Sequence, residues 1–224
     1  MSAPAGRFAR QERLPQVGEA GQRRLAAARV AIVGVGASGS HLAEALGRAG
    51  VGAGPDGWLR LIDRDVVEVS NLPRQQLFTD ADAEAVRPKA QAAAEALLRI
   101  DPSLHVQPRV HDVTADDVAR LLEGAQLVLD GTDNFPTRFL LNDACVSRGV
   151  TWIYCGVVGT EGQALVVRPE GPCLRCYVPE PPPPGSLPTC DTAGVLGSVV
   201  GTIASLAATL ALRELLGAPP EEAP

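Results

Sequence analysis

The sequence is poor in aromatic residues, has no excess of positive charge, and opens on no apolar leader. Only 4% of its 224 residues are Phe, Trp or Tyr, and the formal net charge is −6. A negative chain has no general attraction to nucleic acid, so any phosphate site must be a local basic cluster. Residues Met1 to Pro4 are small and polar, whereas a secretory signal contains an apolar stretch. The chain has five cysteines, an odd number. We expect a cytoplasmic protein that binds no nucleic acid.

One segment is long and apolar enough to raise the question of a membrane. Residues 192–212 contain no charged side chain, and a stretch of that length can span a bilayer. However, it is rich in Gly, Ala, Ser and Thr, and it has neither an aromatic belt nor a basic flank. Gly197 and Gly201 form a small-xxx-small pair that permits close helix packing. We expect a buried helix, in the core or at a dimer interface, and no membrane span.

Short apolar strands alternate with helices along most of the chain. Strands are predicted at 29–33, 58–62, 105–110, 126–129 and 151–154, and helices at 38–49, 88–100, 115–122 and 137–148. This alternation is typical of parallel strands joined by right-handed crossovers. Residues 163–167 read as an antiparallel addition. The fold class predicted is therefore α/β, a Rossmann-like mixed sheet of mostly parallel strands with antiparallel additions and helices on both faces.

The same pattern divides the chain into parts. Residues 1–28 read as an arm and a helix, residues 29–217 as one α/β domain, and residues 218–224 as a tail. Glycines at 50–57 predict a flexible turn. A run of prolines makes residues 178–192 a loop that is neither helix nor central strand.

A glycine-rich turn follows the first predicted strand. Gly34, Gly36 and Gly39 have the spacing of the dinucleotide fingerprint, in its expected place between a strand and a helix. Glycines let the backbone approach a phosphate or ribose, and the helix N-terminus favours negative charge. Asp63 ends the second strand, where a carboxylate accepts hydrogen bonds from ribose hydroxyls. Taken alone, this pattern favours NAD, and a tight turn without a ligand is the alternative.

Charged residues beyond the second strand argue against NAD. Arg74 lies on a loop after Asp63, and Lys89 opens the next helix. Two fixed cations near one nucleotide suit a polyphosphate and the charge that develops when it is cleaved. Asp133 follows the fourth strand, where a carboxylate can hold Mg²⁺ between phosphates. The alternatives are surface charges for the two cations, and an Asx turn or helix cap for Asp133.

The cysteines leave two questions open. Cys173 and Cys176 have the spacing of half a tetrathiolate zinc site, but a second pair is needed and the 224 residues contain none. Cys190 follows the proline-rich loop and precedes a helix, whose N-terminus lowers a thiol pKa. It is a candidate nucleophile, although a solitary cysteine is more often inert.

Taken together, these motifs resemble the MoeB/ThiF/HesA family, the bacterial relatives of ubiquitin-activating enzymes. The resemblance covers Arg7 to about Leu216. The matching segments, in order, are Arg7–Gln11, the glycine turn, Leu61–Asp65, Ser70–Gln75, Pro88 with Lys89, Thr132–Asn134, Gly162 with Gln163, Cys173-x-x-Cys176, and Thr189 with Cys190. This chain departs from the family at the glycine turn, which reads Gly-Ala-Ser-Gly instead of Gly-Gly-Leu-Gly, and in having no second Cys-x-x-Cys, which puts zinc in doubt.

The resemblance implies a homodimeric adenylyltransferase that uses ATP and Mg²⁺. Its second substrate would be the C-terminal Gly-Gly carboxylate of a small ubiquitin-like sulfur-carrier protein, activated as an acyl-adenylate with release of pyrophosphate. Residues 29–217 would then be a ThiF-type adenylation domain, with residues 178–192 as its crossover loop. The resemblance implies that Gly36 lies against the nucleotide, that Asp63 holds the ribose, and that Asp133 positions Mg²⁺. The implied phosphate contacts are Asn71, Arg74 and Lys89, joined by Arg10 of the neighbouring subunit. Cys190 matches a crossover-loop cysteine that serves as a thiol acceptor in some relatives and is dispensable in others.

Three interpretations are carried forward. The first is the carrier-protein adenylyltransferase, and the second is an NAD-dependent oxidoreductase, in which Arg74, Lys89 and Asp133 would have no task. The third is a degenerate, non-catalytic binding protein of the same fold. The sequence does not identify the carrier, and molybdopterin, thiamine and thiolation pathways stay open.

Overall fold

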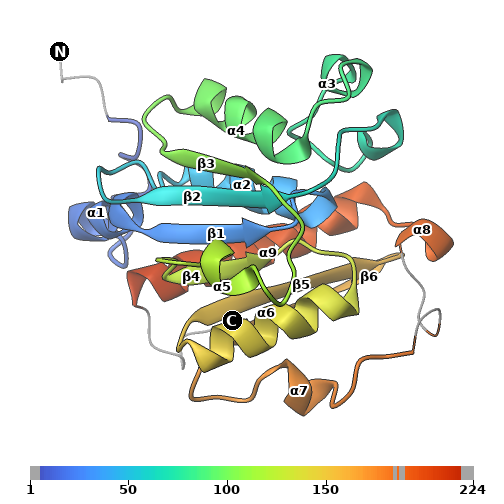
Figure 1. Ribbon diagram of the computed structural model, residues 1–224. Helices are drawn as coiled ribbons and strands as arrows, with labels where there is room; N and C mark the ends of the chain where they lie inside the picture. The colour runs from blue at the N-terminus through green and yellow to red at the C-terminus, as the bar shows by residue number, and fades with distance from the viewer. Residues whose placement is uncertain (1–5, 184–185, 187–189, 218–224) are drawn as a thin grey trace.

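Six strands form one sheet in the order β3-β2-β1-β4-β5-β6 (Figure 1). The computed structural model describes residues 6–183, 186 and 190–217, without the side chains of residues 190 and 191. The strands are β1 (Arg29–Val33), β2 (Trp58–Asp63), β3 (Val106–Val110), β4 (Leu127–Asp130), β5 (Thr151–Val158) and β6 (Glu161–Val167). The first five pair in parallel, and β6 pairs antiparallel with β5. The predicted mixed Rossmann-like sheet is confirmed.

Helices cover both faces of this sheet. One face carries the helices α1 (Gly18–Ala27), α2 (Ala37–Arg48), α4 (Lys89–Ile100) and α9 (Gly197–Leu216), and the other carries α5 (Val118–Leu121), α6 (Phe135–Ser147) and α7 (Leu174–Tyr177). Each layer encloses its own apolar core against the sheet. The remaining short helices are η1 (Val69–Asn71), α3 (Asp80–Glu84) and α8 (Cys190–Ala193).

Strand register brings several loops to one edge. Val33 at the end of β1 pairs with Ile62 of β2 and with Asp130 of β4. The carboxyl ends of three central strands therefore lie level with one another. Loops that follow such ends are where ligands bind in open α/β sheets.

The helix predicted at 115–122 is shorter in the structure, where only Val118–Leu121 is helical. The Thr114 hydroxyl donates to Asp117 Oδ2 at 3.0 Å, and the Asp117 backbone N–H donates to the Thr114 carbonyl oxygen at 3.2 Å. Local bonds of this kind compete with the helical pattern. Helix α3 was not predicted, although Thr79 and Asp82 form a capping box at its start.

The long apolar helix begins later than predicted, at Gly197 instead of Thr192. Gly194 has a left-handed φ of 74°, and Gly159 donates to its carbonyl oxygen at 2.9 Å. Leu196 donates in turn to the Gly159 carbonyl oxygen at 3.0 Å. This contact with the β5–β6 turn separates α8 from α9. Cys190 consequently opens a four-residue helix inside the predicted loop, and not the long helix.

Helix α9 meets the length and apolarity of a membrane span, as the only described helix that does. One of its faces packs on α2, β5 and β6. Its fully buried residues recur at helical spacing: Val200, Ala204, Ala207, Ala208 and Ala211. The expectation of a packed helix is confirmed for this face. The opposite face, with Ser198, Thr202, Ser205, Leu206 and Thr209, is exposed in this chain.

The glycine-rich segment at 50–57 is not the flexible turn that its composition predicts. Gly52 donates to the Leu25 carbonyl oxygen at 3.1 Å, and Gly54 donates to that of Ala26 at 2.8 Å. Gly57 closes the turn by donating to Gly54 at 3.0 Å. The segment is held against the end of α1, because its glycines let two backbones approach closely.

Candidate active site

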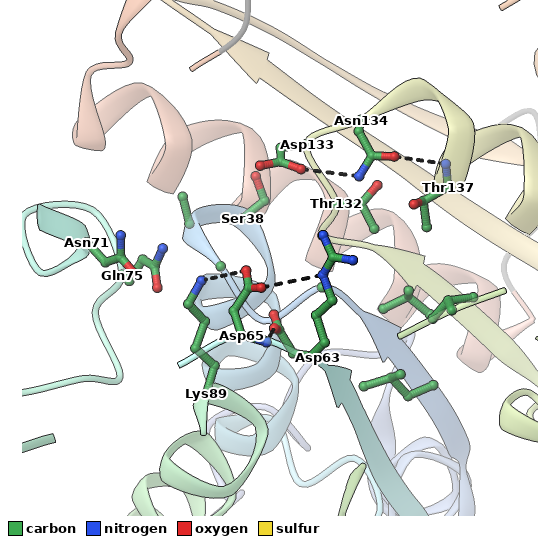
Figure 2. A pocket seen from close by; sticks show the side chains of 18 of the residues that line it. Ser38, Asp63, Asp65, Asn71, Gln75, Lys89, Thr132, Asp133, Asn134 and Thr137 are labelled. Carbon is green, nitrogen blue, oxygen red and sulfur yellow. Dashed lines mark hydrogen bonds and ion pairs between the residues drawn. The ribbon is translucent and has the colours of Figure 1, made fainter. Parts of the chain in front are cut away.

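A cavity of about 800 Å³ opens at the carboxyl ends of β1, β2 and β4 (Figure 2). Its wall includes the predicted residues Gly34, Gly36, Asp63, Asn71, Arg74, Lys89 and Asp133. Residues that lie up to about 100 positions apart in the sequence thus meet at one edge of the sheet, as the alternation of strands and helices predicts.

The glycine turn forms the floor of the cavity. A Cβ atom on Gly34 would lie 2.7 Å from the Gly131 carbonyl carbon, and one on Gly39 would overlap the Gly34 carbonyl oxygen. These two glycines are needed to pack the turns after β1 and β4 together, and Gly39 lies outside the cavity wall. Gly36 differs, because a Cβ there would meet no atom nearer than Gln75 Nε2 at 3.7 Å. Gly36 is therefore the glycine that presents open backbone to a ligand.

Asp63 sits beside this floor at the end of β2. Its Oδ2 accepts a hydrogen bond from the Val35 backbone N–H at 2.6 Å, and its Oδ1 accepts one from the Asp65 backbone N–H at 2.7 Å. Burial raises the pKa of the Asp63 carboxyl above its ordinary value, and the two backbone bonds oppose that rise. The carboxylate is fixed in place, with its pKa raised by its surroundings.

Lys89 is held in the cavity wall by an acid that was not singled out from the sequence. The Lys89 Nζ lies 3.1 Å from Asp65 Oδ2, and the lysine is only 7% exposed. Pro88 precedes α4 as its N-cap, so Lys89 is the first helical residue. The helix start and the ion pair together hold the ammonium group against Asp65 in the cavity wall (Figure 2).

Two buried amides lie on the wall formed by the segment between β2 and α4. Asn71 is 8% exposed and Gln75 is 4% exposed. Neither Asn71 Oδ1 nor Gln75 Oε1 has a hydrogen-bond partner in the described part of the chain. Arg74, between them, is half-buried and donates from Nη1 to the Ser70 carbonyl oxygen at 2.8 Å. Gln75 was quoted in the motif but was not predicted to be a site residue.

Asp133 projects from the loop after β4 on another side of the cavity (Figure 2). The helix cap that was its alternative role belongs to Asn134, whose Oδ1 accepts the Thr137 backbone N–H at 2.9 Å. Asn134 Nδ2 also donates to Asp133 Oδ1 at 3.3 Å. Asp133 is exposed and lines the cavity.

A buried ion pair that the sequence analysis missed supports this loop. Asp130 is fully buried, and its Oδ2 lies 3.0 Å from Arg138 Nε. Thr132 donates its backbone N–H to Asp130 Oδ1 at 2.8 Å, and its own carbonyl oxygen accepts from Arg138 Nη2 at 2.7 Å. Burial raises the pKa of Asp130, and the facing Arg138 charge opposes that rise. The pair fixes the residue that directly precedes Asp133.

Arg10 lies far from this cavity in its own chain. Its neighbour Gln11 donates to the Ala49 carbonyl oxygen at 3.0 Å, at the end of α2. Helix α2 begins at the glycine turn and is 12 residues long, so about 18 Å of helix separates its two ends. In Figure 1 the N-terminal segment lies beside α1, at the opposite end of the sheet from the arrowheads of β1 and β2.

The cysteine pair lies outside the cavity. Cys173 is the N-cap of α7, and Cys176 is exposed on that helix. Burial alone raises the pKa of the Cys173 thiol, but hydrogen bonds from the Arg175 and Cys176 backbone hold it below its ordinary value. Among the described residues, no group of three or more His, Cys, Asp or Glu is placed to hold a metal ion. Within the described part of the chain, Cys173 and Cys176 have no further ligands with which to close a zinc site. The Cys190 side chain lies outside the described residues.

The glycine floor, the acid beside it and the polar wall define a Rossmann-like nucleotide-binding domain. The profile of the ThiF family matches residues 8–224, and the chain belongs to this family. Relatives include a SAMP-activating enzyme E1 of Haloferax volcanii, 40% identical over 94% of this chain and 75% of the relative. The sulfur carrier protein ThiS adenylyltransferase of Bacillus subtilis is 42% identical over 95% of this chain and 61% of the relative. The resemblance inferred from the motifs is confirmed.

Solved structures support the same fold. E. coli MccB in complex with succinimide superposes with a TM-score of 0.79 at 20% sequence identity, over 96% of this chain and 65% of MccB. The chain thus spans about two thirds of MccB and 61% of the B. subtilis relative. The relatives are named activating enzymes and adenylyltransferases, and this argues against the NAD-dependent oxidoreductase.

Proposed function

We propose that this protein is an ATP-dependent adenylyltransferase that activates the C-terminal Gly-Gly carboxylate of a ubiquitin-like sulfur-carrier protein. The observation that carries the proposal is the gathering of Arg74, Lys89 and Asp133 around one cavity whose floor is the open backbone of Gly36. A triphosphate needs cations, a metal-binding carboxylate and close backbone approach in one place. The names of its ThiF-family relatives support the same reaction and the same class of carrier.

The reaction requires alignment and charge neutralisation more than proton transfer. An oxygen of the carrier carboxylate attacks the α-phosphorus of ATP, and the bond from that phosphorus to the bridging oxygen of pyrophosphate breaks. The products are an acyl-adenylate and pyrophosphate. Because the carboxylate is already ionised at neutral pH, no general base is needed, and the enzyme gains most by holding both substrates in line.

Lys89 and Arg74 stabilise the negative charge that gathers on the leaving pyrophosphate. Lys89 enters the reaction from a fixed position, because Asp65 and the start of α4 restrict its side chain. The Arg74 guanidinium is anchored by one nitrogen on Ser70, and within the described residues its other donors remain for a phosphate. Charges that are preorganised in this way need no rearrangement at the moment of reaction.

Asp133 supplies a carboxylate that would hold Mg²⁺, and the ion would supply positive charge against that of the phosphates. This role fits because the Asp133 carboxylate is exposed and because Asn134, not Asp133, caps helix α6. The Asp130–Arg138 pair keeps the loop of Asp133 in position. No step is assigned to zinc, and Cys190 stays a candidate thiol acceptor.

We further infer a homodimer in which Arg10 completes the partner's site. Arg10 lies at the end of α2 opposite its own cavity, so it reaches a cavity only in a second copy whose α2 runs the opposite way. A two-fold axis across the exposed face of α2 and α9 brings the two ends together. That face carries a hollow of about 640 Å³ lined by residues of both helices, among them His41, Glu44, Arg48, Ser198, Thr202 and Ser205.

The cytoplasmic location of the protein stays a prediction.

Exchange of labelled pyrophosphate into ATP tests the proposed reaction. With a carrier ending in Gly-Gly present, Arg74→Ala should lower the exchange rate by roughly 10²–10³-fold, as the loss of one preorganised charge contact does. Arg99→Ala is the matched control, because Arg99 is an exposed arginine on α4 away from the cavity. Exchange that is unchanged in Arg74→Ala would remove this arginine from the mechanism, and no exchange in the wild type would refute the reaction.

Mixing two inactive variants tests the dimer. In a mixed dimer of Arg10→Ala and Arg74→Ala subunits, one site holds both arginines and the other holds neither. We expect the mixture to recover part of the exchange activity that each variant lacks alone. Recovery should follow subunit exchange, measured separately by native mass spectrometry. If subunits exchange and activity stays absent, Arg10 does not act across a dimer.

A further inference from the structure

We propose that Cys173 and Cys176 form a redox-active dithiol, in which Cys173 attacks a small disulfide and Cys176 resolves the mixed disulfide that results. The pair lies at helix α7, outside the cavity wall, and the proposed adenylation assigns it no step. The inference is therefore independent of the proposed function.

The backbone brings the two thiols together. Cys173 is the N-cap of α7, and the Cys176 N–H donates to the Cys173 carbonyl oxygen at 2.9 Å. A bond across one turn places the two Cα atoms within about 7 Å of each other, and a disulfide joins Cα atoms that are about 4.4–6.8 Å apart. The Cys176 side chain also hydrogen-bonds the Cys173 sulfur. The two sulfur atoms can therefore join with little movement of the helix.

Cys173 is the member of the pair that is prepared to attack. The thiolate, and not the thiol, is the nucleophile in disulfide exchange. Burial raises the pKa of the Cys173 thiol, but hydrogen bonds from the Arg175 and Cys176 backbone and from the Asn142 side chain hold it below its ordinary value. Asn142 is only 1% exposed, and its Oδ1 accepts the Leu174 N–H at 2.9 Å. This amide is thus fixed beside the sulfur that it stabilises.

Two other cysteines of the chain show the opposite environment. Cys145 and Cys155 are buried, and burial raises the pKa of each thiol to about 12. Cys173 is half-buried and Cys176 is exposed. Among the four cysteines whose side chains the structure describes, only the Cys173–Cys176 pair offers a thiol that is both open to solvent and close to a second one. Buried cysteines of the other kind are inert.

Helix α7 gives the pair a firm base beside α6 (Figure 1). Leu174 is buried, and Arg175 donates from Nε and Nη2 to the two carboxylate oxygens of Asp143 at 2.8 and 2.5 Å. The residues between the two cysteines are therefore both anchored to α6. No third metal ligand joins the pair in the part of the chain that the structure describes. A dithiol, unlike a zinc site, needs none, and Cys-x-x-Cys is also the spacing of redox motifs.

The proposed reaction is a thiol–disulfide exchange in two steps. The Cys173 thiolate attacks one sulfur of a small disulfide, the sulfur–sulfur bond of that molecule breaks, and the first small thiolate leaves. Cys176, after losing its proton to water, attacks the Cys173 sulfur and displaces the second small thiolate. The protein pair is oxidised to a disulfide by two electrons, and the small disulfide is reduced to two thiols. The reverse sequence returns the dithiol.

Equilibration of the whole chain with mixtures of oxidised and reduced glutathione tests the proposal. After acid quenching and alkylation in urea, peptide mass spectrometry should find a disulfide between Cys173 and Cys176. Its fraction should follow the glutathione ratio, and dithiothreitol should reverse it. Cys176→Ser should accumulate glutathione on Cys173, about tenfold faster at neutral pH than Cys173→Ser accumulates it on Cys176, because a larger share of Cys173 is thiolate. Cys145 and Cys155 should stay reduced and serve as internal controls.

Several outcomes would contradict the proposal. A pair that stays reduced at every glutathione ratio, or a disulfide that joins Cys173 to a different cysteine or chain, overturns the dithiol. Equal rates in the two serine variants overturn Cys173 as the attacking thiol. One tightly held zinc per chain that is lost in Cys173→Ser overturns the redox role, and metal analysis measures it.

The variants should keep the fold, because Cys176 is exposed and serine is a favourable N-cap in place of Cys173. Thermal melting of each variant checks this. If Cys173→Ser does not fold, the alkylation rates of Cys173 and Cys176 in the wild type, mapped by peptide, give the same comparison.

Discussion

The cavity has two walls, and their buried polar groups differ in whether they have hydrogen-bond partners. One wall is formed by the turns after β1 and β4, and the other by residues 65–89 between β2 and α4. In the first, the buried charges Asp130 and Arg138 are bonded to each other and to Thr132. In the second, Asn71 and Gln75 are buried with amide oxygens that no described residue satisfies.

Packing differs in the same way as polarity. In the first wall, Gly34 and Gly131 lie so close that a Cβ on Gly34 would come within 2.7 Å of Gly131. In the second wall, Gln75 Nε2 lies 3.7 Å from where a Cβ on Gly36 would be, which is an ordinary van der Waals distance. The buried charges of the first wall are paired within the described chain, and the two buried amide oxygens of the second wall are not. Substitutions at tightly packed or paired positions should therefore cost stability, and substitutions at positions that face the open cavity should cost affinity.

Breaking the buried ion pair should give the largest effect. Arg138→Met leaves the Asp130 carboxylate buried without its cation, which should lower the free energy of unfolding by roughly 3–5 kcal/mol. Urea denaturation measures this loss. The control is Arg175→Met, which breaks a pair with Asp143 whose side chains are 45% and 48% exposed, and such pairs contribute about 0–1 kcal/mol.

A second variant makes that prediction sharper. Adding Asp130→Leu to Arg138→Met removes both charges, and the double variant should recover much of the stability that the single variant loses. Equal losses for Arg138→Met and Arg175→Met would mean that the buried pair does not hold this wall together.

Two glycines of one turn should separate stability from affinity. Gly39→Ala places a Cβ against the Gly34 carbonyl oxygen, which is backbone and cannot move aside, so unfolding free energy should fall by about 3 kcal/mol. Gly36→Ala meets its first neighbour at 3.7 Å and should leave stability nearly unchanged. It should nevertheless weaken ATP binding, because the methyl group occupies the space of the ligand. If both variants unfold alike, the packed and open positions of this turn do not differ as the geometry indicates.

The sequence predicted the sheet well because alternation of strands and helices is a local signal. Strand β1 has the predicted bounds, and the antiparallel addition appears as β6. The start of α9 could not be predicted in the same way. Its position depends on bonds between Gly159 and the segment at Gly194, which lie 35 residues apart and leave no periodic trace.

The site was predictable where its residues follow strand ends. Asp63, Lys89 and Asp133 come after successive strands or open a helix, and the sheet brings them together. Arg138 and Gln75 carry no such signal. From sequence, an arginine inside a helix is predicted to be a surface charge, and a glutamine beside an arginine is predicted to lie in a loop. Only the structure shows that both side chains are buried and which partners they have. Asp65 lies in the matching segment Leu61–Asp65, but its part in the site is evident only from its bond to Lys89.

The smallest effect should come from Asp63. Its ionisation should strengthen adenosine binding and lower the stability of the fold. Burial holds its pKa above the ordinary value of 3.8. The folded chain therefore binds this proton more tightly than the unfolded chain does. Its contribution to stability is full below pH 3.8 and is lost as the pH rises through the folded pKa. At neutral pH the buried charge is a cost to the fold, and the proposed ribose contact is a reason for that cost.

Ribose hydroxyls donate to the charged carboxylate, so bound adenosine should lower the pKa of Asp63. By linkage, adenosine should bind more weakly as the pH falls through that range, while the contribution of Asp63 to stability grows. Carboxyl ¹³C NMR with and without adenosine measures the midpoint, with the Asp63 signal assigned by its loss in Asp63→Asn. Asp143, whose pKa is lowered by the Arg175 hydrogen bond away from the cavity, is the internal control and should not move. An Asp63 midpoint that adenosine leaves in place would show that this carboxylate holds the glycine turn and does not hold the ribose.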